Sequence, residues 1–210
     1  ASAEERASLD DLWLGYTETF GAPDLREAIA ATYEAQAADN VLCFAGASEG
    51  IFAANQVLLD ADSHAIVVTP NYQSHETLPL AICEATGVPL DPEDGWSLDI
   101  DRVHAAVRPN TRLVTINFPH NPTGAILPLD RYEALIELCR PHGLYLLHDE
   151  IFKGLGPTGT AFLPYVADVY ERGLSLGVMS KAYGLPGLRV GWIASQDQAL
   201  LSKMERLKHY

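Results

Sequence analysis

Short runs of apolar residues alternate with amphipathic stretches along most of the chain. The runs at 41–44 and 65–70 are almost wholly apolar and the run at 112–118 is mostly so, which is typical of strands buried on both faces of a sheet. The segment 129–143 instead repeats its apolar residues every three or four positions, which predicts a helix with one buried face. Alternation of these two patterns predicts a mainly parallel sheet covered by helices on both sides.

The other elements are predicted from the same two periods and from turn residues. The first helix is expected at 23–36, with Pro23 in its first turn and Leu25, Ala28, Ile29 and Tyr33 on one face. The second is expected at 48–59, with the Ser48 hydroxyl as N-cap. Further helices are predicted at 74–85, 99–107 and from about 196 onwards. Further strands are predicted at 88–90, 144–152, 174–180 and 189–195.

No internal repeat and no interdomain linker interrupts this alternation. The prediction is therefore a single α/β domain with a three-layer αβα architecture. Its predicted strands are followed or preceded by polar turns at 45–50, 119–124, 148–150 and 180–189. Because sheets of this kind bind ligands beyond the carboxyl ends of their strands, these turns are the expected place of a binding site.

Lys181, Arg189 and Asp149 are the charged residues that these turns place at strand ends. A lysine between an apolar strand and a Gly/Pro-rich turn suits an amine nucleophile if burial or neighbouring cations lower its pKa. On its own, however, it also suits a structural role. Arg189 opens another apolar strand, where its guanidinium can hold a phosphate through two bonds. Asp149 closes a buried strand, so its carboxylate needs a cation or a donor.

Uncharged groups in the same turns extend this list. Gly46, Ala47 and Ser48 form a small-residue turn at a helix start, which suits an anion. Asn121 lies in an Asn-Pro turn that can present its amide, and Tyr72 offers a flat face for stacking. A phosphate, an aromatic ring and an aldehyde could all be held by such a set.

Composition excludes several classes of partner. The chain has 14 Lys and Arg against 28 Asp and Glu, which gives a net charge of −14, so we expect no nucleic acid and no membrane as a partner. No run approaches the roughly 18 apolar residues of a spanning helix. Cys43, Cys83 and Cys139 are odd in number and form no CxxC pair, which favours reduced thiols in the cytoplasm over a disulfide or zinc site. No metal site is predicted.

The order and spacing of these segments resemble the class I and II aminotransferases, which are fold type I enzymes that use pyridoxal 5'-phosphate (PLP). The resemblance rests on AGASEGI from 45, PNY from 70, NFPHNPTG from 117, HDEIF from 148 and SKAYGLPGLRVGW from 180. YTETFGAPDLREAIA from 16 also looks like the N-terminal segment of that family. The last motif, downstream of the others, is the most specific of them.

The resemblance implies contacts with the cofactor ring. Lys181 is expected to form a Schiff base with the cofactor aldehyde, and Asp149 to pair with the protonated ring nitrogen. Asn121 is expected to bond the ring 3-oxygen, and Tyr72 to stack on the ring. The protonated ring then accepts electrons from the α-carbon of the substrate, while the freed lysine moves the proton.

The resemblance also implies a phosphate site and a second subunit. The residues expected around the phosphate are Gly46, Ala47, Ser48, Ser180 and Arg189. Tyr16 is expected to reach the phosphate of the neighbouring subunit, which implies a homodimer. Residues 1–210 would form the large cofactor-binding domain, with part of an N-terminal arm at 1–20. A smaller C-terminal domain, which would grip the substrate carboxylate, is expected in a longer parent chain.

Two positions depart from the family pattern. Phe152 stands where a tyrosine often bonds the ring 3-oxygen, and Val178 stands where a hydroxyl often contacts the phosphate. Loss of these donors should change the electronics or the affinity of the cofactor without abolishing its binding. His120, His148 and Glu150 flank the expected site and are predicted to pack, cap or pair with neighbouring groups.

The function expected from the resemblance is transfer of an amino group from an amino acid to a 2-oxo acid, in amino-acid metabolism. Two alternatives remain open. One is a PLP-dependent lyase or cyclase acting on an amino acid, because the same cofactor chemistry runs to elimination or cyclisation. The other is a non-catalytic PLP-binding sensor domain of a transcription regulator. A plain dinucleotide-binding fold is disfavoured, because no GxGxxG follows the first strand.

Overall fold

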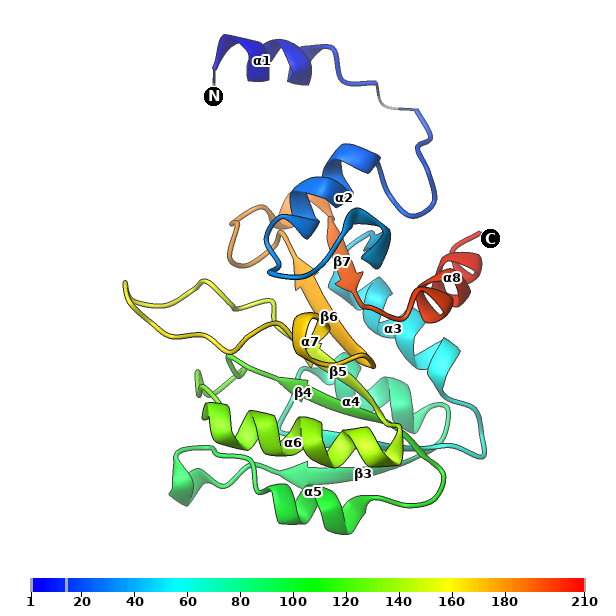
Figure 1. Ribbon diagram of the computed structural model, residues 1–210, viewed down its shortest axis with the longest axis vertical. Helices are drawn as coiled ribbons and strands as arrows, with labels where there is room; N and C mark the ends of the chain where they lie inside the picture. Colours follow the sequence, from blue (N-terminus) through cyan, green and yellow to red (C-terminus); the bar gives the residue numbers. More distant parts are fainter. Residues whose placement is uncertain (1, 14, 210) are drawn as a thin grey trace.

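The computed structural model describes residues 2–13 and 15–209, and within them one sheet forms the centre of the molecule (Figure 1). Seven strands of the described chain pair in the order β1-β7-β6-β5-β4-β2-β3. β7 runs antiparallel to both of its neighbours, and the other pairs are parallel. The predicted mainly parallel sheet is thus confirmed. The strands are β1 (Val41–Phe44), β2 (His64–Thr69), β3 (Glu84–Pro89), β4 (Thr111–Asn117), β5 (Tyr145–Asp149), β6 (Gly173–Val178) and β7 (Gly191–Ala194).

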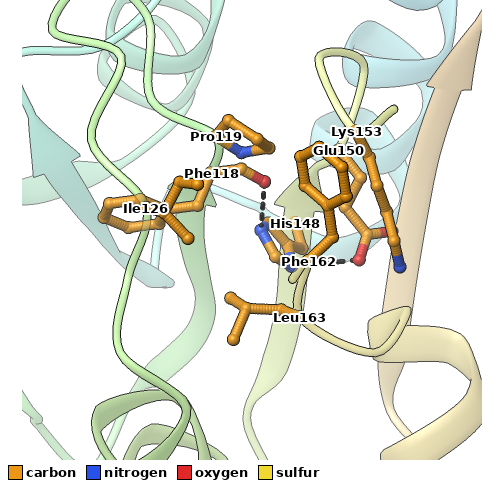
Figure 2. Close-up of a pocket in the computed structure, with 8 residues that line it drawn as sticks. All are labelled: Phe118, Pro119, Ile126, His148, Glu150, Lys153, Phe162 and Leu163. Atoms are coloured by element: carbon orange, nitrogen blue, oxygen red, sulfur yellow. Dashed lines mark hydrogen bonds and ion pairs between the residues drawn. The ribbon is translucent and has the colours of Figure 1, made fainter. Parts of the chain in front are cut away.

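Helices cover both faces of the sheet, which confirms the three-layer αβα architecture. α3 (Ala47–Leu58), α4 (Gln73–Leu80) and α8 (Gln198–Leu207) pack on one face. The helices on the other face are α2 (Pro23–Ala30), α5 (Ile100–Ala106), α6 (Leu129–His142) and the short α7 (Val166–Val169). Near the carboxyl edge, that second face encloses a small cavity (Figure 2).

α6 shows how the sequence pattern produces the buried layer. Tyr132, Leu135, Ile136 and Cys139 recur at three- and four-residue spacing, and all four are buried against the sheet. The helix ends at Gly143, whose φ of 61° is left-handed and therefore costs glycine little. The predicted helix at 129–143 is confirmed.

Two predicted helices are too long. The first ends at Ala30 instead of residue 36; of its predicted face, Ile29 and Tyr33 are buried and Ala28 is exposed. The Asp168 carboxylate accepts the backbone N–H groups of Glu34 and Ala35 at 3.0 and 3.1 Å, which stabilises a non-helical path there. The helix predicted at 74–85 is α4, which ends at Leu80.

The start of β3 and the end of β5 also differ from the predictions. β3 begins at Glu84, four residues before the predicted strand, because parallel pairing with β2 orders a sequence with few apolar residues. β5 ends at Asp149, and Ile151 lies in the following turn. These boundaries depend on strand pairing, which local periodicity does not report.

The N-terminal helix and the cysteines complete the description. α1 (Ala3–Asp10) stands away from the rest of the fold (Figure 1), and Leu9, Leu12 and Trp13 around its end are exposed. The described part of the chain contains no helix that is both long and apolar enough to cross a membrane. Its three cysteines are free thiols, and burial raises the pKa of Cys43 to about 11.

Leu147 in the central strand tests the packing between the sheet and the α3 face. Its side chain is 0% exposed and belongs to the core shared with α3 and α8. Leu147→Ala should lower the free energy of unfolding by about 2–5 kcal/mol, because it removes buried methyl groups and leaves a cavity. Urea unfolding followed by circular dichroism measures this change. Leu155, which is 51% exposed in a loop, is the control, and its alanine variant should stay within about 0.5 kcal/mol of wild type. Equal losses in the two variants would contradict this packing.

Candidate functional site

A cavity of about 230 Å³ lies at the carboxyl edge of the sheet. Four separate turns supply its walls, each following or preceding a strand, as expected for a sheet of this kind. Seven of the predicted site residues line it: Ala47, Ser48, Tyr72, Asn121, Ser180, Lys181 and Arg189. The remaining wall is mainly apolar and consists of Ile151, Phe152, Val178 and Pro186. The structure thus brings together residues that are up to 142 positions apart (47 to 189).

One end of the cavity combines a helix N-terminus with a guanidinium. Gly46 is the N-cap residue of α3, with a φ of 102°, and the first-turn N–H groups of Ala47 and Ser48 donate to no protein group among the described residues. A Cβ at Gly46 would lie 2.3 Å from Nη2 of Arg189, so only glycine permits this close approach. Free N–H groups, the helix dipole and a guanidinium all favour an anion at this end.

Two details of this end differ from the sequence prediction. Ser48 is not the N-cap of α3, because the helix already begins at Ala47 and no side chain caps it. Instead the Glu49 carboxylate accepts the Ala45 N–H at 2.5 Å, which fixes the turn without using the N–H groups inside the cavity. The Ser48 hydroxyl therefore remains available at the cavity wall.

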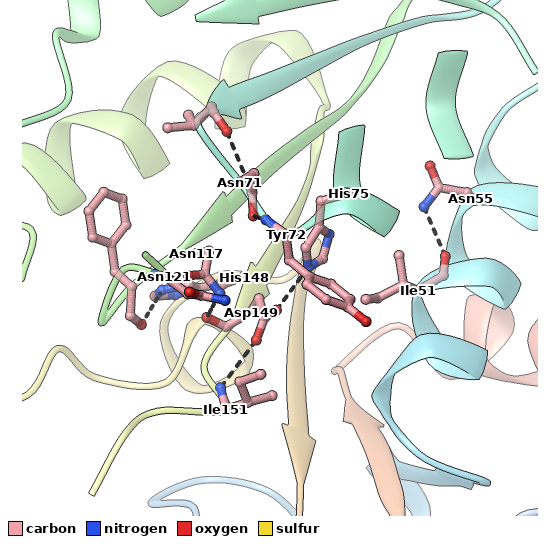
Figure 3. A network of polar contacts seen from close by, with 12 residues as sticks. Ile51, Asn55, Asn71, Tyr72, His75, Asn117, Asn121, His148, Asp149 and Ile151 are labelled. Atoms are coloured by element: carbon pink, nitrogen blue, oxygen red, sulfur yellow. Dashed lines mark hydrogen bonds and ion pairs between the residues drawn. The ribbon is translucent and has the colours of Figure 1, made fainter. Parts of the chain in front are cut away.

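A buried carboxylate lies next to the wall residue Ile151. Asp149 is 1% exposed and is not among the side chains of the wall. Its Oδ2 lies 2.9 Å from Nε2 of His75, and its Oδ1 accepts the N–H of Ile151 at 3.2 Å (Figure 3). The donors that a buried carboxylate was predicted to need are therefore present. Because Asp149 accepts, Nε2 of His75 carries the hydrogen.

His75 is the residue that the sequence analysis missed. It is buried at the start of α4, and its ring stands edge-on to that of Tyr72 with 6.5 Å between the centroids. Its partner Asp149 is 74 residues away in sequence. A lone histidine in a polar stretch carries no local signal of such a contact.

The turn that carries Asn121 is held by side chains on both sides. Asn117 at the end of β4 accepts the Asn121 N–H through Oδ1 at 2.7 Å. His120 lies at 2.7 Å from both the Thr123 hydroxyl and the Pro70 carbonyl. Burial lowers the pKa of His120, which suits a neutral ring that donates from Nε2 and accepts at Nδ1. His120 thus packs and bonds as predicted, outside the cavity wall.

Lys181 differs from the expectation of a buried amine. It lies on the cavity wall but is exposed to solvent, so burial in this structure does not activate it. Its Nζ stands 5.8 Å from the centroid of the Phe152 ring, a cation–π distance. Phe152 thus faces the lysine with an aromatic surface and offers no hydroxyl.

Tyr16 is not part of this cavity. Its side chain is 99% exposed in the segment after α1. The predicted role of Tyr16 concerns a neighbouring subunit and stays a prediction. Among the described residues, no group of three or more His, Cys, Asp or Glu is placed to hold a metal ion.

Comparison with known families places almost the whole chain in one group. The family described as aminotransferase class I and II matches residues 1–209. The arginine–pyruvate transaminase of Pseudomonas aeruginosa is 35% identical over 216 residues, which cover 96% of this chain and 54% of the relative. The capreomycidine synthase of Streptomyces vinaceus is 37% identical over 205 residues, covering 96% and 52%. The chain spans about half the length of these relatives.

Solved structures agree with this grouping. A PLP-dependent aminotransferase from Streptococcus suis superposes with a TM-score of 0.91 and 26% identity, over 100% of this chain and 56% of the other. A mutant aspartate aminotransferase of Thermus thermophilus gives a TM-score of 0.89 and 29% identity, over 97% and 57%. The fold of the described residues is therefore that of these proteins.

Gly46 tests the anion-binding end of the cavity. Gly46→Ala adds a methyl group where Arg189 now lies and also strains a positive φ, so affinity for inorganic phosphate should fall by roughly tenfold, as when one charge-assisted contact is lost. Isothermal titration calorimetry measures this affinity. Gly95→Ala is the matched control, because Gly95 also has a positive φ but faces open space. Equal phosphate affinity in both variants would show that this end does not bind the anion.

Proposed function

The chain belongs to the class I and II aminotransferases, and from this premise we propose that it forms the cofactor-binding part of a PLP-dependent aminotransferase. The proposed reaction moves an amino group from an amino acid to a 2-oxo acid. The observation that carries this proposal is one cavity that combines the amine of Lys181 with a helix N-terminus suited to an anion, next to the buried carboxylate of Asp149, which bonds the wall residue Ile151. Lysine, phosphate site and carboxylate are the groups that PLP chemistry requires of a protein.

The residues present fit the cofactor in chemical type. The Gly46 position leaves room that a Cβ would fill, beside the Arg189 guanidinium and two free N–H groups, which suits a phosphate. Tyr72 and Asn121 on the wall suit an aromatic face and a ring oxygen. Asp149 has no cation partner among the described residues other than His75, which suits a protonated ring nitrogen.

When bound, PLP supplies an electron-withdrawing ring that weakens the bonds at the α-carbon of an attached amino acid. Asp149 would keep the ring nitrogen protonated, because an anion stabilises a neighbouring cation. His75 donates to the same carboxylate and so orients it. The proposed role of Asp149 thus depends on a residue of α4.

Lys181 would supply the amine for attachment of the cofactor and would then move a proton at the substrate α-carbon. Its side chain lies on the cavity wall and is exposed to solvent. The Phe152 ring beside it and the Ile151 and Val178 side chains would exclude water from one wall. Arg189, Ser48 and the backbone of Ala47 would hold the phosphate and fix the distance to Lys181.

A second candidate reaction is a PLP-dependent cyclisation or elimination on an amino acid. Two observations favour it. One is the 37% identity to a capreomycidine synthase. The other is that Phe152 and Val178 stand where the family often has hydroxyl-bearing side chains. Phe152 and Val178 both lie on the cavity wall, so two donors expected near the cofactor are missing. The amino-acid substrate would in either case enter the same cavity.

The oligomer and the compartment belong to the proposal as well. The exposed Leu12, Trp13 and Tyr16 after α1 suit an arm that packs on a second copy, so we expect a homodimer. The free cysteines suit the reducing cytoplasm.

Lys181 gives the direct test of the cofactor assignment. Wild type with added PLP should show a visible absorption band that borohydride makes permanent, whereas Lys181→Ala should show no trapped band. Transfer of the amino group to a 2-oxo acid should fall by roughly 10²–10⁴-fold, the usual contribution of a proton-transferring group. Lys203, an exposed lysine on α8, provides the matched control variant Lys203→Ala. Trapping in the Lys181→Ala protein would refute the assignment.

Tyr16 tests the dimer separately. Sedimentation equilibrium should give twice the monomer mass for wild type and for Tyr16→Phe. Loss of the hydroxyl should weaken PLP binding by about threefold to tenfold, as for a single hydrogen bond. A monomeric wild type, or unchanged PLP affinity in Tyr16→Phe, would count against a Tyr16 contact across subunits.

A further inference from the structure

A second polar cluster lies behind Asp149, on the opposite face of β5. Because side chains alternate along a strand, His148 and Glu150 point away from the Asp149 side. They line a small cavity together with Phe118, Phe162 and Lys153 (Figure 2). The His148 and Glu150 side chains are 1% and 2% exposed. The mechanism above uses neither of them.

The contacts of His148 determine where its protons lie. Its Nε2 is 3.0 Å from the carbonyl oxygen of Phe118, which only accepts, so Nε2 carries a hydrogen. Its Nδ1 is 3.1 Å from Oε1 of Glu150. A neutral ring beside an ionised Glu150 would then leave two acceptor atoms 3.1 Å apart, which is repulsive. A proton on Nδ1 or on Glu150 relieves this repulsion.

The contacts of Glu150 favour that proton on the ring. Oε1 already accepts the Val166 N–H at 3.1 Å, and an ionised carboxylate oxygen accepts a second donor readily. A protonated His148 with an ionised Glu150 satisfies the Phe118 carbonyl and the Val166 N–H at once. Two buried charges are stable only as a pair, and here the pair joins the start of α7 to β5.

Two atoms in this cluster lack a partner. Nδ1 of His148 is not aligned for a hydrogen bond to Oε1, and Oε2 of Glu150 has no partner among the described residues. The cavity they line has a volume of about 10 Å³, close to the roughly 10–15 Å³ that one water molecule needs. A single water there would accept from Nδ1 and donate to Oε2.

We infer that His148 and Glu150 form a buried ion pair, bridged by one water molecule, that positions the turn carrying Asn121 from the far face of β5. The Phe118 carbonyl held by His148 lies at the start of that turn, three residues before Asn121. Asn117 holds the same turn from β4 and also donates from Nδ2 to the Asp149 carbonyl at 3.4 Å. The ion pair also cancels the charge of Glu150 next to Asp149. This positioning role rests on the proposed function, whereas the protonation of the pair does not.

Burial and the charge of Glu150 raise the pKa values of three tyrosines. Tyr132 on α6, whose ring centroid is 5.5 Å from that of His148, has a pKa raised by burial and by the charge of Glu150. The same two causes raise the pKa of Tyr165, before α7, to about 12 and that of Tyr33, after α2, well above its usual value. All three phenols stay neutral near pH 7.

Lys153 and Asp168 are the other charged groups around the pair. Burial lowers the pKa of Lys153, and its coupling to Glu150 and Asp168 opposes that shift. The Lys153 ammonium lies 3.1 Å from the Tyr165 ring centroid. The three phenols are already protonated near neutral pH and take no proton from His148.

Histidine NMR tests the ion pair without any cofactor. Long-range ¹H–¹⁵N spectra of protein labelled at histidine, with His148 identified by its absence in His148→Gln, should show hydrogen on both ring nitrogens at pH 7. Glu150→Gln removes the counter-charge, so His148 should become neutral with hydrogen on Nε2 only. A neutral His148 in wild type, or a doubly protonated one in Glu150→Gln, would overturn the ion pair.

PLP titration followed by visible absorption tests the positioning role. His148→Gln and Glu150→Gln should each weaken PLP binding by roughly tenfold, as expected when a buried hydrogen-bonding partner is lost. His64→Gln is the matched control, because His64 is buried and bonded through both ring nitrogens. It is the first residue of β2 and so lies at the amino ends of the parallel strands, away from the cavity at their carboxyl ends. This variant should lose comparable thermal stability and retain wild-type PLP affinity. Weakening no greater than in His64→Gln would overturn the positioning role.

The two proposals fail in different ways. If wild type binds no PLP, the proposed function is wrong, and the amide chemical shifts of residues 117–124 in cofactor-free protein then decide the positioning role. They should change in Glu150→Gln and stay at wild-type values in His64→Gln. Unchanged shifts in Glu150→Gln would overturn it.

Discussion

The buried carboxylate of Asp149 is the constraint on which the arrangement of the site depends. Taking an ionised carboxylate out of water costs several kcal/mol unless donors or cations replace the water. Here the donors are the His75 ring and the Ile151 backbone. Through these two donors, α4 and the turn after β5 both contact the Asp149 carboxylate at the end of the central strand. A cationic group of a ligand next to Asp149 would add a third partner to this carboxylate.

The strand that carries Asp149 holds polar groups on both faces. On the α4 face Asp149 meets His75, and on the α6 face His148 meets Glu150. In both places a histidine nitrogen lies within 3.1 Å of a buried carboxylate oxygen. The carboxylates of Asp149 and Glu150 stay on opposite sides of the sheet. The turn with Asn121 is bonded to β5 through the Phe118 carbonyl and Asn117. The cavity wall is thereby supported from behind by side chains that never reach its surface.

Close backbone packing is the second constraint, and it acts at the anion-binding end. A Cβ at Gly191 would lie 2.5 Å from the carbonyl carbon of Gly46, so β7 and the turn before α3 approach more closely than side chains permit. Arg189 just before β7 has a left-handed φ of 51°, which aims its side chain across Gly46. The antiparallel direction of β7 is what brings the start of this strand, and with it Arg189, to the edge where the parallel strands end.

The sequence by itself determined the layer architecture, most strand positions and seven residues of the cavity wall, because buried strands are largely apolar runs and their polar turns stand out against them. It also indicated the need for a partner to Asp149 from burial alone. Local pattern failed where long-range contacts decide the path: Asp168 ends α2 early, and pairing with β2 begins β3 at Glu84. The tertiary structure alone decided that this partner is His75, that Lys181 is exposed and that His148 faces Glu150. The physical reason is that each of these depends on which side chains meet across the sheet, and hydrophobic periodicity reports burial but not the identity of the neighbour.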